Sequence, residues 1–360
     1  MISDCLAREK TLRPFALAGS ANVASYEAIH RFDFEAAKRW QEWAVPFHAR
    51  TSGPFSVIYG YCLSGLAESE LLNVQQAEHY YRKAYDLARR SGGHRSYTTR
   101  LAGTMLGESL YEQGHLDDAE RLLDECSELG SEGGVVDFMV ATYGTGSRIK
   151  ALRGDIVAAA RRLDEGTQIA TALSLPRLAA RIENERTRWQ IAPVQYPPAM
   201  TAVRGPSDAT ARTSHPINGV TEVTTELHED SAIRRLLASG NSGDAAQAHQ
   251  RAGKLVARAT ALHRPRAVLR ASLLHVVTTR RVKAEHDALD ALVPLIAQCF
   301  HLGLIRPLCD EGPTLTQLVA TLAELREARQ WKPGWPAVPT TFLCAVLASS
   351  TDTSPPPAPH

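Results

Sequence analysis

The sequence predicts an all-α fold, a right-handed solenoid of stacked helical hairpins, and three observations support this. An alanine recurs at near-constant spacing, 40, 42 and 40 residues apart in one series and 40 in another. A helix-starting residue stands four positions before five of the six alanines. Glycine or proline breaks close the units, and a fixed period of about 40 residues is typical of two-helix repeats. The alanines are Ala37, Ala77, Ala119, Ala159, Ala248 and Ala288, and the helix starters are Asp33, Asn73, His115, Asp155 and Asp244.

Residues 1–192 are predicted to form a first helical block of about four hairpins plus one further helix. In the second helix of a hairpin, apolar or small residues recur at helical spacing, as in Val74, Ala77, Tyr81 and Ala84. Small side chains are expected there because bulky ones would hold two crossing helices apart. Breaks at 91–93, 129–131 and 175–176 separate the units, and residues 178–191 supply the additional helix.

The register then jumps by 89 residues, from Ala159 to Ala248. Residues 193–226 are rich in proline and glycine, and we expect a loop or linker there. Residues 227–328 are predicted to form a second helical block that ends in a capping helix over 315–326. The tail, 329–360, contains Trp331, Trp335 and many prolines, and we expect it to be partly disordered.

Composition favours a globular protein without a global preference for nucleic acid. The chain has 360 residues, 44% of them hydrophobic and 22% charged, with a formal net charge of +1. The acid-free basic stretch 251–283 leaves a nucleic-acid binder open as an alternative. The six cysteines are scattered without a CxxC pair, which argues against a zinc site and a disulfide framework. No signal peptide or membrane-spanning run is found, so the expected compartment is the cytoplasm.

No motif predicts an enzyme. The segment at Gly144, Gly146 and Ser147 is only a fragment of a phosphate-binding loop, and it falls within a predicted repeat helix. An SxxK match at Ser147 and Lys150 lacks the strand that β-lactamase-type chemistry needs. No HExxH occurs among the 13 histidines. We therefore expect no catalytic residues, no metal and no cofactor.

Four segments of the chain resemble a known family. The run 106–120 (LGESLYEQGHLDDAE), the segments 151–155 and 174–181, and the run 303–312 (GLIRPLCDEG) look like the tetratricopeptide-type repeats of MalT-like regulators, the large ATP-dependent members of the LuxR family. The resemblance covers roughly residues 20–325 and implies a sensor region.

Members of that family usually add a nucleotide-binding switch and a DNA-reading helix-turn-helix, and neither motif is found in this sequence. A similar region also occurs at the C-terminal end of actinobacterial MalT-like serine/threonine kinases, and no kinase motif is found here either. A fragment of a larger regulator or kinase therefore stays open, as does the oligomeric state.

The first helix of each hairpin is expected to line the concave side of such a solenoid. Arg181, Asn184 and Arg188 share one helical face there, and such donors suit a carboxylate, a phosphate or an acidic peptide. A solvated helix face is the alternative. We predict that a small-molecule inducer or a protein partner binds in the groove, without a membrane and without direct DNA binding. The full set of candidate residues is Tyr59, Thr104, Glu108, Tyr111, Arg148, Arg181, Asn184 and Arg188.

Overall fold

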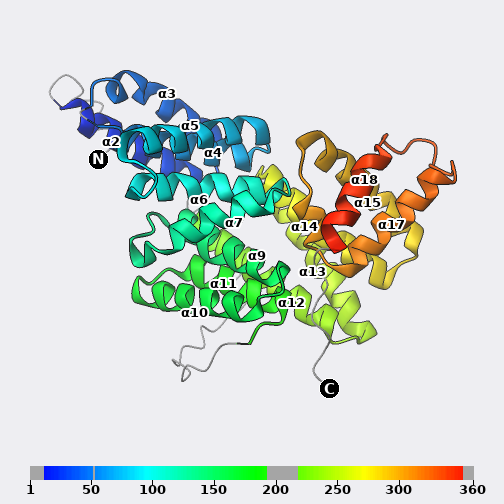
Figure 1. Cartoon of the computed structure of the whole chain (residues 1–360). Helices are drawn as coiled ribbons and strands as arrows, with labels where there is room; N and C mark the ends of the chain where they lie inside the picture. Colours follow the sequence, from blue (N-terminus) through cyan, green and yellow to red (C-terminus); the bar gives the residue numbers. More distant parts are fainter. Residues whose placement is uncertain (1–11, 52, 193–217, 352–360) are drawn as a thin grey trace.

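The computed structural model describes residues 12–51, 53–192 and 218–351, and these residues form helices and turns without a β-strand (Figure 1). The predicted all-α solenoid is confirmed. The first block consists of α2 (Pro14–Ile29), α3 (Phe34–His48), α4 (Phe55–Glu70), α5 (Val74–Gly92), α6 (Tyr97–Glu112), α7 (Leu116–Ser127), η1 (Gly130–Glu132), α8 (Val136–Met139), η2 (Val140–Thr145), α9 (Gly146–Leu152), α10 (Ile156–Ala172) and α11 (Pro176–Trp189). The second block consists of α12 (Gly219–Ala238), α13 (Ser242–Ala261), α14 (Pro265–Val282), α15 (Glu285–Leu302), α16 (Arg306–Cys309), α17 (Pro313–Glu327) and α18 (Thr340–Thr351).

The recurring alanines lie where helices cross. All six belong to the second helices α3, α5, α7, α10, α13 and α15, and each is at most 2% exposed. A larger side chain at these contacts would force neighbouring backbones apart. The alanine period therefore reports the stacking distance of the hairpins.

Local turn chemistry starts the second helices. The side chains of Asp33 and Asp155 each accept a hydrogen bond from a backbone N–H in the first turn, at 2.9 Å. The residue just before the cap has a left-handed backbone, with φ +79° at Gly154 and φ +61° at Phe32. The prediction that Asp244 starts a helix is wrong, because α13 begins at Ser242 and is capped by Asn241, so Asp244 lies inside the helix.

The predicted loop 193–226 is wrong at its C-terminal end. Helix α12 begins at Gly219, because the Asn218 side chain caps its first turn and the Gly219 N–H donates to the carbonyl oxygen of His30 at 2.8 Å. A Cβ at Gly219 would lie 2.1 Å from that oxygen. The glycine that we interpreted as a loop residue thus allows α12 to start against the first block. Residues 193–217 lie outside the described residues.

The predicted tail also contains packed structure. Helix α18 packs against α17, with Leu343 fully buried and Phe342 9% exposed. The Trp331 and Trp335 rings meet edge to face at 5.2 Å, and the Trp335 indole N–H donates to Asp290 of α15 at 2.7 Å. These contacts cover the end of the second core. Residues 352–360 lie outside the described part of the chain.

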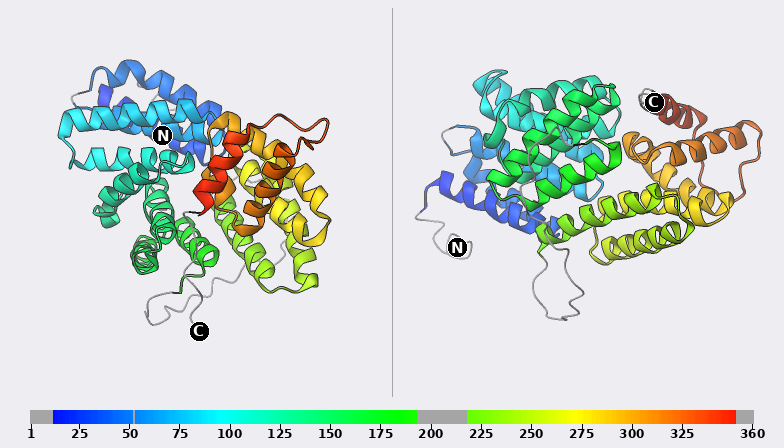
Figure 2. Two further views of the ribbon diagram at one scale, coloured as in Figure 1. Left: turned by 45° about the vertical axis from the view of Figure 1, so that its right-hand side comes forward. Right: turned by 90° about the horizontal axis from the view of Figure 1, so that it is seen from below.

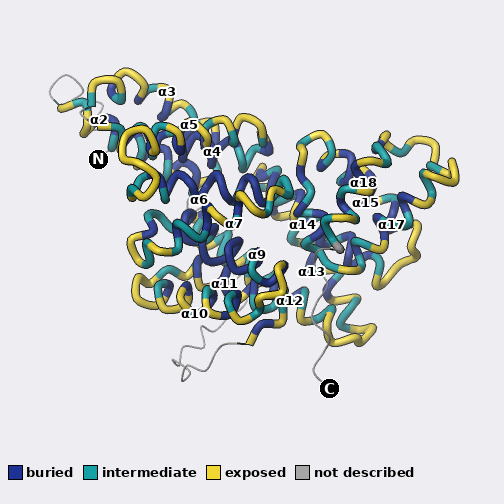
Figure 3. Tube along the Cα trace, viewed as in Figure 1, coloured by how far each residue is buried: buried dark blue, intermediate teal, exposed yellow. Residues whose placement is uncertain are grey.

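The second block packs beside the first (Figures 1 and 2), where it contacts the first helices α4, α6 and α11. The backbone N–H of Ile305 donates to the carbonyl oxygen of Glu112 at 2.9 Å, and α11 packs directly on α12. Figure 3 shows α6 as buried along most of its length, since it lies between other helices on several sides. No helix in the described ranges is long and apolar enough to cross a membrane.

Candidate functional site

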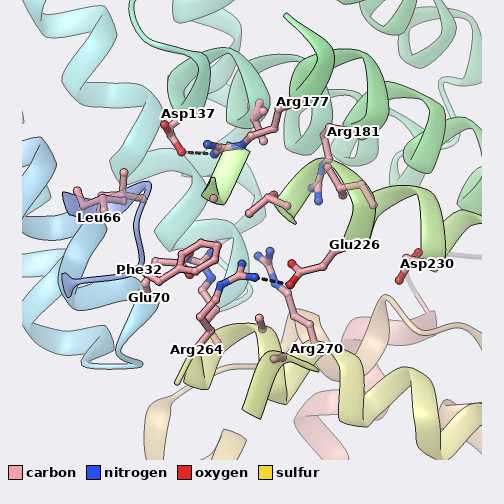
Figure 4. Close-up of a pocket in the computed structure, with 18 of the residues that line it drawn as sticks. Phe32, Leu66, Glu70, Asp137, Arg177, Arg181, Glu226, Asp230, Arg264 and Arg270 are labelled. Carbon is pink, nitrogen blue, oxygen red and sulfur yellow. Dashed lines mark hydrogen bonds and ion pairs between the residues drawn. The ribbon is translucent and has the colours of Figure 1, made fainter. Parts of the chain in front are cut away.

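A cavity of about 190 Å³ lies between the two blocks (Figure 4). The first helices of the hairpins, α2, α4, α6 and α11, line one side of it, and α12, α13 and α14 line the other. Its walls mix apolar side chains such as Leu66, Met105 and Leu255 with charged ones such as Glu108 and Arg181. A concave site with an apolar body and a few placed polar groups is the usual form of a small-molecule pocket.

The buried carboxylate of Asp310 joins the blocks next to this cavity. Asp310 follows α16, and it accepts hydrogen bonds from the Tyr111 hydroxyl at 2.9 Å, from Arg148 Nη1 at 2.6 Å and from Arg306 Nη2 at 2.6 Å. Its side chain is 5% exposed. Burial alone would raise its pKa, but the charges of Arg306 and Arg148 lower the pKa of Asp310 to about 2. These four residues, which we call the Asp310 cluster, border a smaller adjoining cavity of about 50 Å³.

Helix α11 presents its predicted face to the second block. Asn184 Nδ2 donates to Asp230 Oδ1 of α12 at 2.6 Å. Arg188 pairs with the same carboxylate at 3.2 Å and with Glu311 at 3.3 Å. Although burial opposes ionisation, Arg188 and a second arginine, Arg234, hold the pKa of Asp230 well below its ordinary value. The polar face of α11 is therefore neutralised by carboxylates of the second block.

Arg181 differs from its neighbours on α11. It is 7% exposed, its Nη2 lies 2.9 Å from Glu185, and its Nε is buried without a hydrogen-bond partner. Glu185 is also the partner of Arg148, whose Nε donates to it at 2.9 Å. Burial lowers the pKa of Arg181 to about 10, because one shared carboxylate does not replace the lost water.

Six of the eight candidate residues meet at these cavities. Glu108, Arg181, Asn184 and Arg188 line the cavity between the blocks, and Tyr111 and Arg148 line the adjoining one. Two residues do not line either cavity. Thr104 is fully buried and its hydroxyl donates to the carbonyl oxygen of Arg100 in its own helix. Tyr59 packs edge to face on Phe138, because this part of α4 faces the first core.

Sequence reasoning missed most of the partners of these residues. Asp310 and Glu311 stand in the segment that resembles MalT-like repeats, but nothing in the spacing placed them beside α11. The pairing of Arg181 with Glu185 could have been predicted, because residues four apart are neighbours on a helix. The other missed residues are Asp137, Arg177, Glu226, Asp230, Arg264, Arg266 and Arg270.

The basic stretch 251–283 is largely paired with acids in other segments. Arg264, just before α14, pairs with Glu226 of α12 and stacks on the Phe32 ring at 4.1 Å. Arg266 and Arg270 both contact Glu112 at 2.7 Å. Arg251, Arg258 and Arg280 also have carboxylate partners. These contacts do not support the nucleic-acid alternative, which stays a prediction.

The described residues contain no group of three or more histidine, cysteine or acidic side chains arranged to hold a metal ion. Four of the cysteines are buried free thiols, and the pKa values of Cys62 and Cys299 are raised to about 12 by burial. A thiol in such surroundings stays protonated and unreactive.

Comparison with known proteins supports the helical-repeat fold. The model of the MalT-like TPR region matches residues 15–325. The serine/threonine-protein kinase PknK is 42% identical over 313 residues, in two strains of Mycobacterium tuberculosis (CDC 1551 / Oshkosh and ATCC 25618 / H37Rv) and in Mycobacterium bovis (ATCC BAA-935 / AF2122/97). The match covers 87% of this chain and 27% of each kinase, so the chain spans about a quarter of the length of these relatives. The repeat register, the helical hairpins and this match together show that the chain belongs to the MalT-like TPR region family.

Proposed function

We propose that this regulatory helical region senses a small molecule by binding it in the cavity between its two blocks. The observation that supports the proposal is the shared lining of the cavity, from α4, α6 and α11 on one side and from α12 and α14 on the other. A ligand that contacts both blocks favours the conformation in which they are closed over it. Such a shift is what a signalling protein can transmit to an adjoining domain or chain.

The similarity to PknK favours a role in signalling by a kinase of that kind over the sensor of a LuxR-family transcription regulator. PknK is named as a serine/threonine kinase. In our proposal this chain has a non-catalytic role in such a signalling system. We place its action in the cytoplasm. A volume of about 190 Å³ suits a small molecule better than a protein segment, so a protein partner would bind elsewhere on the solenoid.

The test uses the full chain and two tryptophan variants. Ala267 of α14 lines the cavity, and Ala257 of α13 is exposed to solvent. The wild type, A267W and A257W are dialysed against a defined mixture of amino acids, organic acids, nucleotides and sugar phosphates, and retained compounds are measured by mass spectrometry. We expect one class of compound to be retained by the wild type and by A257W but not by A267W. Retention of nothing by the wild type, or equal retention by A267W, would contradict the proposal.

A further inference from the structure

Arg181 lines the cavity and has one ion-pair partner among the described residues, which it shares with another arginine. Arg188, on the same face of α11, pairs with two carboxylates of the second block, whereas Arg181 forms an ion pair only with Glu185 of its own helix, at 2.9 Å. Glu185 is 0% exposed and also accepts two hydrogen bonds from Arg148. One carboxylate therefore serves two buried guanidinium groups, although Arg148 has Asp310 as a second partner.

The position of Arg181 makes this charge available to a ligand. Figure 4 shows its side chain extending from α11 into the cavity, on the side opposite Arg264. The side chain passes over Gly144 of η2, where a Cβ would lie 2.6 Å from Arg181 Nε. The glycine thus lets the guanidinium pack on the backbone, with Nε buried and unpartnered. A donor of this kind costs free energy until an acceptor reaches the group.

Part of the cavity wall is apolar and suits an apolar body of limited size. Leu66 and Met105 are buried on the first block, and Val223, Leu255 and Ala259 face them from the second. A cavity of about 150 Å³ lined by aliphatic side chains holds benzene. The volume here, about 190 Å³, therefore has room for a benzene-sized body plus one small polar group.

We propose that the cavity binds a small monocarboxylic acid with an apolar body, whose carboxylate accepts hydrogen bonds from Arg181. The inference depends on the proposed sensing function and specifies the chemistry of its ligand. A monoanion suits Arg181, because its only ion-pair partner among the described residues, Glu185, is shared with Arg148, whereas Arg188 pairs with two carboxylates. A phosphate dianion would bring more negative charge than Arg181 can neutralise.

The test measures binding of benzoate, its neutral isostere benzamide and inorganic phosphate to the full chain by isothermal titration calorimetry. We expect benzoate to bind at least about tenfold more tightly than benzamide, because the charge-assisted hydrogen bonds need the carboxylate. Arg181→Gln should remove that preference and leave benzamide binding unchanged, and Arg181→Lys should keep part of it. Arg186→Gln is the matched control, since Arg186 lies on α11, pairs with Asp164 and does not line the cavity.

The inference is overturned if benzamide binds as tightly as benzoate, if phosphate binds more tightly than benzoate, or if Arg181→Gln keeps the preference. If Arg181→Gln does not fold, the test uses the ratio of benzoate affinity to benzamide affinity in the wild type and in Arg181→Lys. A ratio in Arg181→Lys equal to that of the wild type would also overturn the inference. Failure here is distinguishable from failure of the sensing function. If the wild type retains a non-acidic compound that A267W does not, the sensing cavity is supported and the proposal of a carboxylic acid ligand is refuted. Retention of no compound would refute both.

Discussion

Replacing Asp310 by asparagine tests whether its carboxylate joins the two blocks. The change keeps the shape of the side chain and removes the negative charge that Arg148 and Arg306 face. Arg306 is 1% exposed and has no other carboxylate within ion-pair distance among the described residues. Removing one partner of a buried pair costs about 3–5 kcal/mol, because the other charge stays buried and unpaired. We expect a loss of free energy of unfolding in this range at pH 7.

The pH dependence of the free energy of unfolding gives a second measure of the contacts of Asp310. Asp310 has an ordinary pKa of 3.8 and a pKa of about 2 in the folded state. A lowered pKa in the folded state stabilises the protein above the unfolded value, and this difference is worth about 2.5 kcal/mol at pH 7. That stabilisation is lost as the pH falls, and about half of it remains at pH 3. The asparagine variant lacks this contribution, so its difference from the wild type should shrink as acid is added.

The assay is urea unfolding followed by circular dichroism and tryptophan fluorescence, at pH 7 and at steps down to pH 3. Asp86→Asn is the control, because Asp86 is an exposed residue of α5 without an ion-pair partner in the described chain, and it should change stability by less than about 0.5 kcal/mol. The reasoning is refuted if Asp310→Asn unfolds at the same urea concentration as the wild type at pH 7. It is also refuted if the difference between them is independent of pH.

Three further changes test other contacts by the same unfolding measurement. Gly219→Ala should lower the free energy of unfolding by about 2 kcal/mol or more, because its methyl would lie 2.1 Å from a backbone oxygen. Gly253→Ala, in a helix interior with its nearest atom at 3.6 Å, should instead raise it by about 0.5–1 kcal/mol. The opposite order of stability would refute the close contact at Gly219. Arg148→Gln should cost about 3 kcal/mol and clearly more than Arg181→Gln, because Arg148 bonds two carboxylates, and equal losses would contradict this. Asp33→Ala should cost about 1 kcal/mol through the lost cap, and an unchanged midpoint would refute its capping role.

Local sequence patterns were sufficient for the hairpins. The alanine positions and the capping residues before α3 and α10 depend on contacts between residues close in sequence or on a repeated helix crossing. The errors occurred where a distant contact decided the structure. Gly219 was interpreted as part of a loop because its partner, the carbonyl oxygen of His30, is remote in the sequence. The burial of Phe342 and Leu343 likewise depends on packing of α18 against α17.

The candidate site shows the same limit in its electrostatics. The face formed by Arg181, Asn184 and Arg188 was predictable from helical spacing, and the three residues line the cavity between the blocks. The ion-pair partners of the candidate arginines were not predictable, because Arg188 pairs with Asp230 of α12 and Arg148 pairs with Asp310, 162 residues away. Most of the donors that we expected to bind a ligand are therefore bonded within the protein. Arg181 is bonded to Glu185 as well, but its Nε has no hydrogen-bond partner.

The sequence by itself determined the helical hairpins and the side of the solenoid on which the polar residues gather, because helix periodicity and capping act over a few residues. Only the tertiary structure decided that a second block closes over that side, that its carboxylates neutralise Arg148 and Arg188, and that a cavity remains beside Arg181. The physical reason is that burial and charge compensation depend on every group within a few ångströms. Those groups come from segments whose proximity no local pattern encodes.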